Sequence, residues 1–393
     1  MKIKTDITSA QQISRRSFLK TGATALALPM INLGSFKVFA ASETRYSSKV
    51  IDLVNSSQVF DMLSLLTPIG QMMEAMFSDK PKQQDAYKIS DQYMRTILSS
   101  GIDVFHPAVG LGADEAMPFV AGLNSMVAEH AGHIKRIDSI SDLEGLKKGQ
   151  QVGLIIGIQN ADHFRVVDDV DQFYHLGQRV SQLTYNSRNL IGTGSTDRSD
   201  GGLSAFGVQI VERMNKLGMA VDVSHCGDQT TLDAFEVANK PVLITHSNVR
   251  ALAGGHIRCK SDQAIKAMGK SGSVMGITGV RQFVSDKEPT NISSIIDHID
   301  YVSRLVGVEH VGIGSDMDMD GYDDIPQPYY DALKANYKAS YAFRGKIDTD
   351  GYDHPRRIFD LTAGLVKRGY ADDDIRLILG GNFKRVLGDI WSA

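Results

Sequence analysis

The sequence predicts an α/β protein built as a (β/α)8 barrel, the TIM barrel fold. Eight short runs rich in branched and aromatic residues recur along the chain, and most are apolar almost throughout, as strands covered on both faces are. Segments with helical periodicity separate these runs. The chain has 393 residues, which is long for one domain unless it closes into a barrel. Strand and helix in eightfold alternation therefore favour one barrel over two domains.

The predicted strands follow one another at intervals that leave room for a helix between most neighbours. They are residues 59–66, 102–109, 152–159, 179–185, 219–225, 242–247, 273–280 and 310–316. Between them, residues 207–217 repeat apolar side chains at helical spacing, and Ser261 and Asp262 begin a second such segment at 262–268. Ser141 and Asp142 give the same helix-start signal before Leu143.

The region after the eighth strand is the least regular part of the chain. Residues 317–356 are rich in Tyr, Asp and Gly, which predicts a long loop over the barrel mouth, and long loops in compact domains are usually functional. Its aromatic residues could line a ligand pocket or pack the loop itself; they are Tyr322, Tyr329, Tyr330, Tyr337, Tyr341 and Phe343. Residues 360–391 are expected to form two helices, with a turn at 380–382.

The N-terminus has the pattern of a twin-arginine export signal. Arg15 and Arg16 precede Phe18 and Leu19, and a weakly apolar stretch then runs to a small-residue cleavage site at Ala40. The stretch is interrupted by polar residues, so a permanent membrane anchor is not expected. The predicted organisation is a signal peptide at 1–40 and a single barrel domain at 41–393. The twin-arginine machinery would deliver the folded protein to the periplasm.

The net charge limits the classes of binding partner, and the cysteine content bears on disulfide formation. The formal net charge is −4, and the excess of Lys and Arg in residues 1–40 makes the remainder more acidic still. Nucleic-acid binding is therefore not expected, because it needs clustered positive charge. Cys226 and Cys259 are the only cysteines, and in an oxidising compartment they could be free or paired.

Candidate functional residues stand at the carboxyl ends of the predicted strands, where barrel enzymes place their chemistry. They are Gln159, Tyr185, His225, His246 and Asp316. Imidazole nitrogens bind a cation such as Zn²⁺, and a carboxylate can take the proton of an attacking water. Two histidines on neighbouring strands with an aspartate on the last strand therefore favour a hydrolytic metal site. The alternative is that each histidine is a structural polar group at a strand end.

The same residues carry a family resemblance. The string from Met214 to His225, which reads MNKLGMAVDVSH, resembles the membrane (renal) dipeptidase family, peptidase family M19, whose members are zinc-dependent barrel hydrolases. Further matching segments follow in order along most of the chain; they are residues 183–189, 241–248, 310–316 and 380–386. The resemblance implies a metal-dependent hydrolase barrel acting on dipeptides. It also implies a small peptide-like substrate and, since relatives are often dimers, a homodimer.

Carried over residue by residue, the resemblance implies an altered centre. The family holds one metal with a His-x-Asp pair after the first strand, replaced here by Leu63 and Leu65, and bridges two metals with a Glu, replaced by Gln159. A family His that orients the transition state is matched by Tyr185. His225, His246, Asp316 and the substrate-recognising Arg258 are retained, although Cys259 follows Arg258 where the family usually has Asn.

Leucine has no lone pair for a metal, and glutamine has no full negative charge to share between two cations. We therefore expect at most one zinc ion, on His225 and His246, with Gln159, Asp316 or water completing its shell. His106, Asp162 or His163 could substitute for the lost ligands. Asp316 and Tyr185 are the expected catalytic residues, and Arg258 with Tyr185 the expected substrate-binding residues.

Two functions remain open. The first is a periplasmic dipeptidase-like metallohydrolase acting on a dipeptide or small amide whose carboxylate meets Arg258. The second is a barrel that binds or matures a small peptide-derived compound without hydrolysis. It is suggested by the simultaneous change of Leu63, Leu65, Gln159 and Tyr185 while the folding motifs persist.

Overall fold

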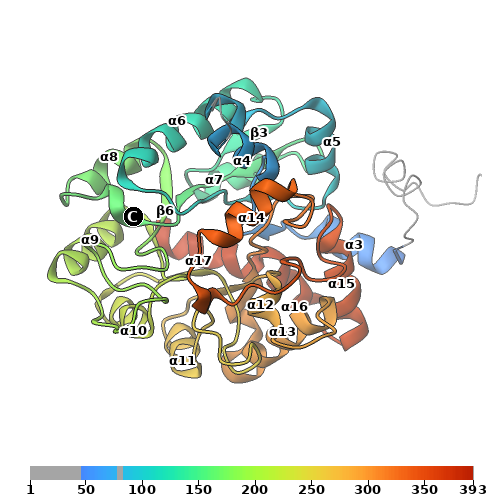
Figure 1. Ribbon diagram of the computed structural model, residues 1–393. Coiled ribbons are helices and arrows are strands. Elements are labelled where there is room, and N and C mark those ends of the chain that lie inside the picture. The colour runs from blue at the N-terminus through green and yellow to red at the C-terminus, as the bar shows by residue number, and fades with distance from the viewer. Residues whose placement is uncertain (1–45, 78–82, 393) are drawn as a thin grey trace, which may run out of the picture. The chain divides into compact units, whose positions relative to one another are not determined.

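The computed structural model describes residues 46–77 and 83–392, which form a barrel of parallel strands surrounded by helices (Figure 1). The predicted signal peptide lies outside the described residues. The strands are β1 (Phe60–Asp61), β2 (Val104–Phe105), β3 (Ile134–Arg136), β4 (Val152–Leu154), β5 (Ile156–Ile158), β6 (Gln178–Gln182), β7 (Ala220–Asp222), β8 (Ile244–Ser247), β9 (Met275–Ile277) and β10 (Val311–Ile313).

The helices mostly follow their strands in sequence and pack outside them. They are α3 (Ser48–Ser56), α4 (Ile69–Phe77), α5 (Asp91–Ser99), α6 (Ala113–Glu129), α7 (Ile140–Glu144), α8 (Asp169–His175), α9 (Ala205–Leu217), α10 (Asp228–Val237), α11 (Asp262–Lys270), α12 (Arg281–Val284), α13 (Ile292–Val306), α14 (Gln327–Ala335), α15 (Arg357–Arg368), α16 (Asp372–Arg376) and α17 (Asn382–Trp391). Short helical turns are η1 (Gln83–Tyr87), η2 (Ala161–His163), η3 (Val308–His310), η4 (Ala339–Tyr341) and η5 (Leu377–Gly381). No described helix is both long and apolar enough to cross a membrane.

Three parallel sheets join to close the barrel. They run β1-β2-β4-β3, β5-β6-β7 and β8-β9-β10. The chain passes directly from β4 into β5, and a bridge between Asp222 and Leu243 joins the second sheet to the third. The Met62 N–H donates to the Ile313 carbonyl at 2.9 Å and closes the last strand on the first. The predicted (β/α)8 barrel is confirmed.

The predicted elements need several corrections. The paired strands are shorter than the apolar runs, and the run at 152–159 is split at Ile155 into β4 and β5. β3, which was not predicted, pairs with β4 outside the barrel. Its Lys135 and Arg136 interrupt the apolar pattern from which the other strands were predicted. The periodic segments at 207–217 and 262–268 lie within α9 and α11, and Ser261 caps α11 as expected, its side chain accepting from the Ala264 N–H.

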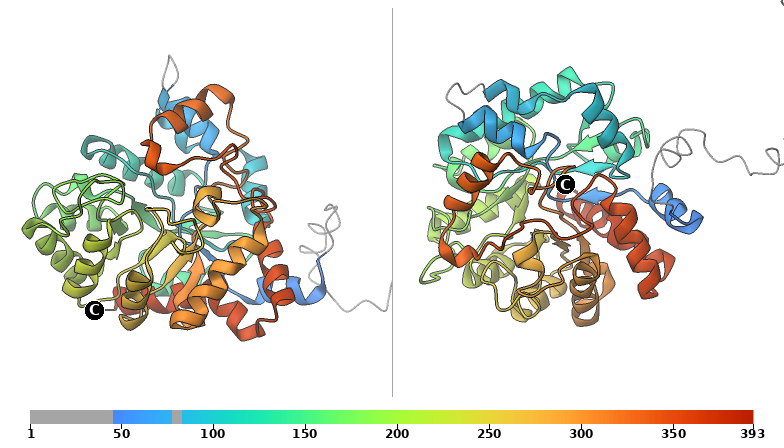
Figure 2. Two further views of the ribbon diagram at one scale, coloured as in Figure 1. Left: turned by 60° about the horizontal axis from the view of Figure 1, so that its bottom comes forward. Right: turned by 45° about the vertical axis from the view of Figure 1, so that its right-hand side comes forward.

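The C-terminal tail forms three helices, not two. α15 ends at Gly369, which adopts the left-handed conformation, and α16 runs through η5 into α17 with a kink at Gly380. Apolar side chains of α17, including Phe383 and Leu387, pack against Phe60 and Leu243 in the barrel core. The tail therefore plugs one end of the barrel, and α4 and α14 cross the opposite end (Figure 2).

The long segment over the mouth is not wholly a loop. It contains α14 and η4, and no side chain of α14 is fully buried. The apolar face of α14, with Tyr329, Tyr330 and Leu333, is only partly buried, and a helix of 9 residues is too short for periodicity to reveal it. We call residues 317–356 the lid. The lid is fastened to the barrel by Arg344, whose Nη1 donates to the Ser285 carbonyl and the Thr290 hydroxyl, both at 2.8 Å.

Candidate functional site

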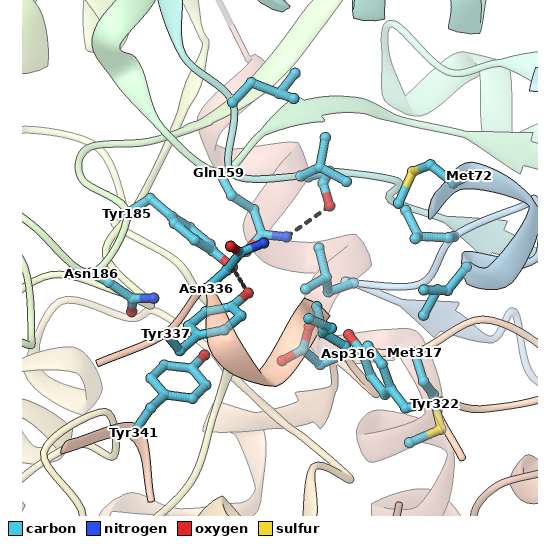
Figure 3. A pocket seen from close by; sticks show the side chains of 18 of the residues that line it. Met72, Gln159, Tyr185, Asn186, Asp316, Met317, Tyr322, Asn336, Tyr337 and Tyr341 are labelled. Carbon is cyan, nitrogen blue, oxygen red and sulfur yellow. Dashed lines mark hydrogen bonds between the residues drawn. The ribbon is translucent and has the colours of Figure 1, made fainter. Parts of the chain in front are cut away.

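A cavity of about 420 Å³ opens at the carboxyl ends of the strands, between the barrel and the lid (Figure 3). We call it the chamber. Its polar side chains include Gln159, Tyr185, Asn186, Asp316 and Tyr337. Much of the remaining wall is hydrocarbon or thioether, from Leu63, Leu65, Ile69, Met72, Met73 and Met317. Such a wall, with a few convergent polar groups, is typical of a small-molecule site.

The two predicted histidines meet beneath the chamber. His225 follows β7 by three residues and His246 lies within β8, so neighbouring strands bring them together. Their Nε2 atoms are 2.9 Å apart, and both side chains are fully buried. Burial and the nearby Arg258 guanidinium hold the pKa of each histidine well below its usual value. Both rings are therefore neutral at pH 7.

Hydrogen bonds to the other ring nitrogens decide where the protons lie. The Thr245 hydroxyl donates to Asp222 Oδ2 at 2.7 Å, so it accepts from His246 Nδ1 at 2.8 Å. Asn186 Oδ1 accepts from His225 Nδ1 at 2.7 Å. The two Nε2 atoms lie at hydrogen-bonding distance from each other, while Thr245 and Asn186 hold the two rings through their Nδ1 atoms. Imidazoles that bind a metal are oriented in this way, by an acceptor fixed to the second nitrogen.

The rest of the family metal centre is missing. Leu63 is buried and Leu65 lines the chamber, and neither can bind a cation. Gln159 Nε2 donates to the Ala108 carbonyl at 2.7 Å. Across residues 46–77 and 83–392, no three His, Cys, Asp or Glu side chains converge as metal ligands would. The residues present do not fit a two-metal centre. Of the family's metal ligands, the two histidines His225 and His246 are retained.

Two of the three proposed substitute ligands, His163 and Asp162, are engaged elsewhere, and His106 is engaged through one ring nitrogen. His163 Nε2 bonds to Gln178 Oε1 at 3.1 Å, and Asp162 accepts from Asn160. His106 Nδ1 bonds to the Met62 carbonyl at 2.7 Å, and its Nε2 has no partner among the described residues. Both cysteines are free and buried.

Arg258 lies behind the histidines and does not line the chamber. Its guanidinium donates to the carbonyls of Ser224 and His246, the latter at 2.9 Å, and the side chain is only 1% exposed. Lys260, which sequence reasoning missed, is equally buried and donates to the Val223 carbonyl at 2.7 Å. The close spacing of these two cations in the sequence was the available signal. The predicted contact of Arg258 with a substrate carboxylate stays a prediction.

Tyr185 separates His225 from the chamber. Its ring stacks on the His225 ring at 4.4 Å between centroids, and its hydroxyl lies 2.7 Å from that of Tyr337 in the lid (Figure 3). Tyr337 in turn stacks on Tyr341 at 4.4 Å. Burial raises the pKa of the Tyr185 hydroxyl well above its usual value, so it stays protonated and can donate. The aromatic residues of the lid thus both line the pocket and pack the lid.

Asp316 is the one predicted acid that faces the chamber. It adopts a left-handed backbone conformation, with φ of 63°, directly after the last strand. Burial, and secondarily the negative charge of Asp61, raise its pKa to about 7, while Arg258 opposes the rise. The described residues provide no hydrogen bond or ion pair to its carboxylate. A carboxylate with this pKa can both accept and return a proton near neutral pH.

A closed barrel with paired histidines at its strand ends defines the class of metal-dependent hydrolase barrels. The family model "Membrane dipeptidase (Peptidase family M19)" matches residues 113–337. The chain belongs to this family of metallopeptidases, as the resemblance predicted.

Curated relatives agree. The chain is 27% identical to dipeptidase verJ of Clonostachys rogersoniana over 271 residues, covering 68% of this chain and 63% of the relative. It is 30% identical to dipeptidase aclJ of Aspergillus oryzae over 245 residues, 61% of this chain and 52% of the relative. The matches thus span less than two thirds of the length of these relatives.

Solved structures share the fold. An amidohydrolase from Pseudomonas aeruginosa superposes with a TM-score of 0.74 at 27% identity, over 87% of this chain and 99% of that one. The probable dipeptidase PvdM from Pseudomonas aeruginosa gives 0.70 at 21% identity, over 91% and 99%.

Proposed function

We propose that this protein is a dipeptidase-type hydrolase that takes a dipeptide or small amide into the chamber. The observation that carries the proposal is Asp316, a carboxylate with a pKa near 7 and no described partner, in a cavity at the barrel mouth. Membership of the dipeptidase family supports the reaction class. The chamber volume falls within the range of small-molecule sites.

The residues of the chamber suggest how the reaction is divided among them. Ionised Asp316 accepts a proton from a water that attacks the amide carbon, and then gives that proton to the departing nitrogen as the C–N bond breaks. The Tyr185 hydroxyl, fixed by Tyr337, donates a hydrogen bond to the amide oxygen as negative charge develops there. In total, water adds across one amide bond and yields an acid and an amine.

A single zinc ion is part of this proposal, held by Nε2 of His225 and His246 with Gln159 near. It is supported by the two neighbouring Nε2 atoms, 2.9 Å apart, on rings that Asn186 and Thr245 hold through Nδ1. An ion bound there would supply Lewis-acid chemistry that lowers the pKa of water. The buried positive charges of Arg258 and Lys260 oppose it.

A second function is favoured by the missing ligands. Leu63, Leu65 and Gln159 remove three of the family's metal contacts, and Tyr185 covers His225. These features support a barrel that binds or matures a small peptide-derived compound without cutting it.

Metal analysis combined with a dipeptide screen distinguishes the hydrolase from the barrel that binds without cutting. We expect about one zinc ion per chain in protein purified without added metal, lost in a His225→Ala, His246→Ala double variant but kept in the control His133→Ala. We expect Asp316→Asn to lower kcat by about 10²- to 10⁴-fold, the usual contribution of a general acid-base. Tight ligand binding with no turnover by the unmodified protein would favour the second function, and absence of metal would leave the histidines as structural residues.

The proposal also includes export to the periplasm by the twin-arginine machinery, without a lasting membrane anchor. It further includes a homodimeric state. The paired Arg15 and Arg16 with the weakly apolar stretch after them support export, and the family resemblance supports the dimer. Replacing Arg15 and Arg16 by lysine should leave the protein in the cytoplasm, which cell fractionation measures. Sedimentation of the purified chain tests the dimer.

A further inference from the structure

A small annex opens from the chamber beside Asp316. Its volume is about 50 Å³, and it shares Tyr185, Asp316, Tyr322, Tyr337 and Tyr341 with the chamber wall. A single water needs roughly 10–15 Å³ of such space, so the annex has room for a group of only a few heavy atoms. It is an extension of the chamber with its own lining.

Aromatic rings form most of that lining. They come from Tyr185 and His225 on the barrel, Phe283 in α12, and Tyr322, Tyr337, Tyr341 and Phe343 in the lid. The rings contact one another in a continuous cluster: Phe283 meets Tyr341 edge-on at 5.3 Å, and Tyr341 meets Phe343 at 5.1 Å. Figure 3 shows Tyr322 beside Asp316, with Tyr337 and Tyr341 on the opposite side of the pocket. The faces of such rings attract a cation.

Asp316 is the only carboxylate among the residues that line the annex, and in the described part of the chain no basic nitrogen lies within 4.0 Å of it. Arg258, the nearest source of positive charge, is committed to backbone carbonyls and lies over the Phe283 ring at 5.6 Å. The carboxylate therefore points into an aromatic enclosure without a counter-ion. An organic cation is the ligand that satisfies both features.

We propose that the annex binds a primary ammonium group whose aliphatic stem lies in the chamber. The stem would contact Leu63 and Leu65, the two leucines that stand in place of metal ligands. In the proposed reaction, the departing nitrogen takes one proton from Asp316 and leaves as a neutral amine, and a second proton from the newly formed carboxylic acid converts it to the ammonium that the annex retains. This link rests on the proposed function, but the binding itself requires no turnover.

Calorimetric titration of the full chain at pH 8 tests the annex directly, with n-butylammonium as the cation and n-butanol and butyrate as neutral and anionic counterparts. We expect only n-butylammonium to bind. Asp316→Asn should weaken the binding of n-butylammonium at least tenfold. Asparagine is a suitable replacement because it also tolerates the left-handed backbone conformation at this position. Asp324→Asn, which removes an exposed lid carboxylate, is the matched control and should have no effect.

A second variant tests the rings with Asp316 intact. Phe343→Leu keeps an apolar side chain but removes one ring face. It should lower the affinity for n-butylammonium by about threefold or more. Alaninamide and N-acetyl-lysinamide then identify the source of the amine as an α-amino group or a lysine side chain, by competition with n-butylammonium. Equal binding of n-butanol, or unchanged affinity in Asp316→Asn, overturns the proposal. Absence of dipeptide turnover would count against the proposed function alone.

Discussion

At the residue scale, the site depends on close contacts that allow no extra atom. His106 Nε2 lies against the Cα of Gly157, and a Cβ built on this glycine would overlap the imidazole ring. His106 is fully buried between β2 and β5, where burial lowers its pKa and keeps it neutral. Gly157 therefore lets a neutral histidine fill the barrel interior directly below Gln159.

Gly157→Ala should destabilise the protein by about 1–3 kcal/mol, because the added methyl group must displace His106 in a packed core. Thermal unfolding of the variant measures the loss. Gly132→Ala is the matched control, since its Cβ would meet no atom within 4 Å. An unchanged melting temperature in Gly157→Ala would mean that His106 can move freely.

At the element scale, the lid is held by buried acids. Asp348 Oδ2 accepts the Asp323 N–H at 2.7 Å, and the side chain is 1% exposed. Arg281 Nη1 pairs with Glu288 at 2.8 Å, and its Nε donates to the Asp348 carbonyl. Burial raises the pKa of Asp348 to about 7. The lid thus carries a carboxyl group that is more easily protonated when folded than when unfolded.

This carboxyl group makes the lid sensitive to pH. Its folded pKa of about 7 exceeds the unfolded value of 3.8, so the folded state binds more protons between these values and loses stability as pH rises through them. Asp348→Asn keeps an oxygen acceptor and cannot ionise. We expect the melting temperature of the variant, relative to the unmodified protein, to be higher at pH 8 than at pH 5. A difference independent of pH would show that Asp348 ionises normally.

At the scale of the whole molecule, one buried ion pair ties the first strand to the C-terminal region. Arg357 at the start of α15 lies 3.3 Å from Asp61 in β1, and both side chains are fully buried. Its Nη1 also donates to the Asp318 carbonyl at 2.6 Å. Ser315, after the last strand, donates to Asp61 through its N–H at 2.7 Å. The first strand, the last strand and the C-terminal helices therefore meet at Asp61.

Arg357→Met should cost about 3–5 kcal/mol, because it leaves the Asp61 carboxylate buried without its partner. Adding Asp61→Asn should recover part of that loss, since the unpaired charge is then removed. Chemical denaturation of the two single variants and the double variant measures the coupling. Simple additivity of the two single effects would contradict a role for the pair in closing the barrel.

Local sequence carries much of the fold. The apolar runs gave the barrel strands because a strand buried on both faces must be apolar throughout, and His225 and His246 could be paired because neighbouring strands end at the same face. α14 escaped detection because it is short and its apolar face is only partly buried, and β3 because it is short and half polar. The enclosure of Arg258 could not be read locally, because carbonyls distant in sequence supply its partners.

The sequence by itself determined the family, the barrel and the loss of metal ligands at Leu63, Leu65 and Gln159, because each depends on residue type and order. Only the tertiary structure decided what surrounds these positions. It fixed the ring orientations of the two histidines through Thr245 and Asn186, and it placed Tyr185 over His225. It also enclosed Asp316 in aromatic rings brought by the lid. Protonation and burial depend on atoms that meet only when distant segments fold together.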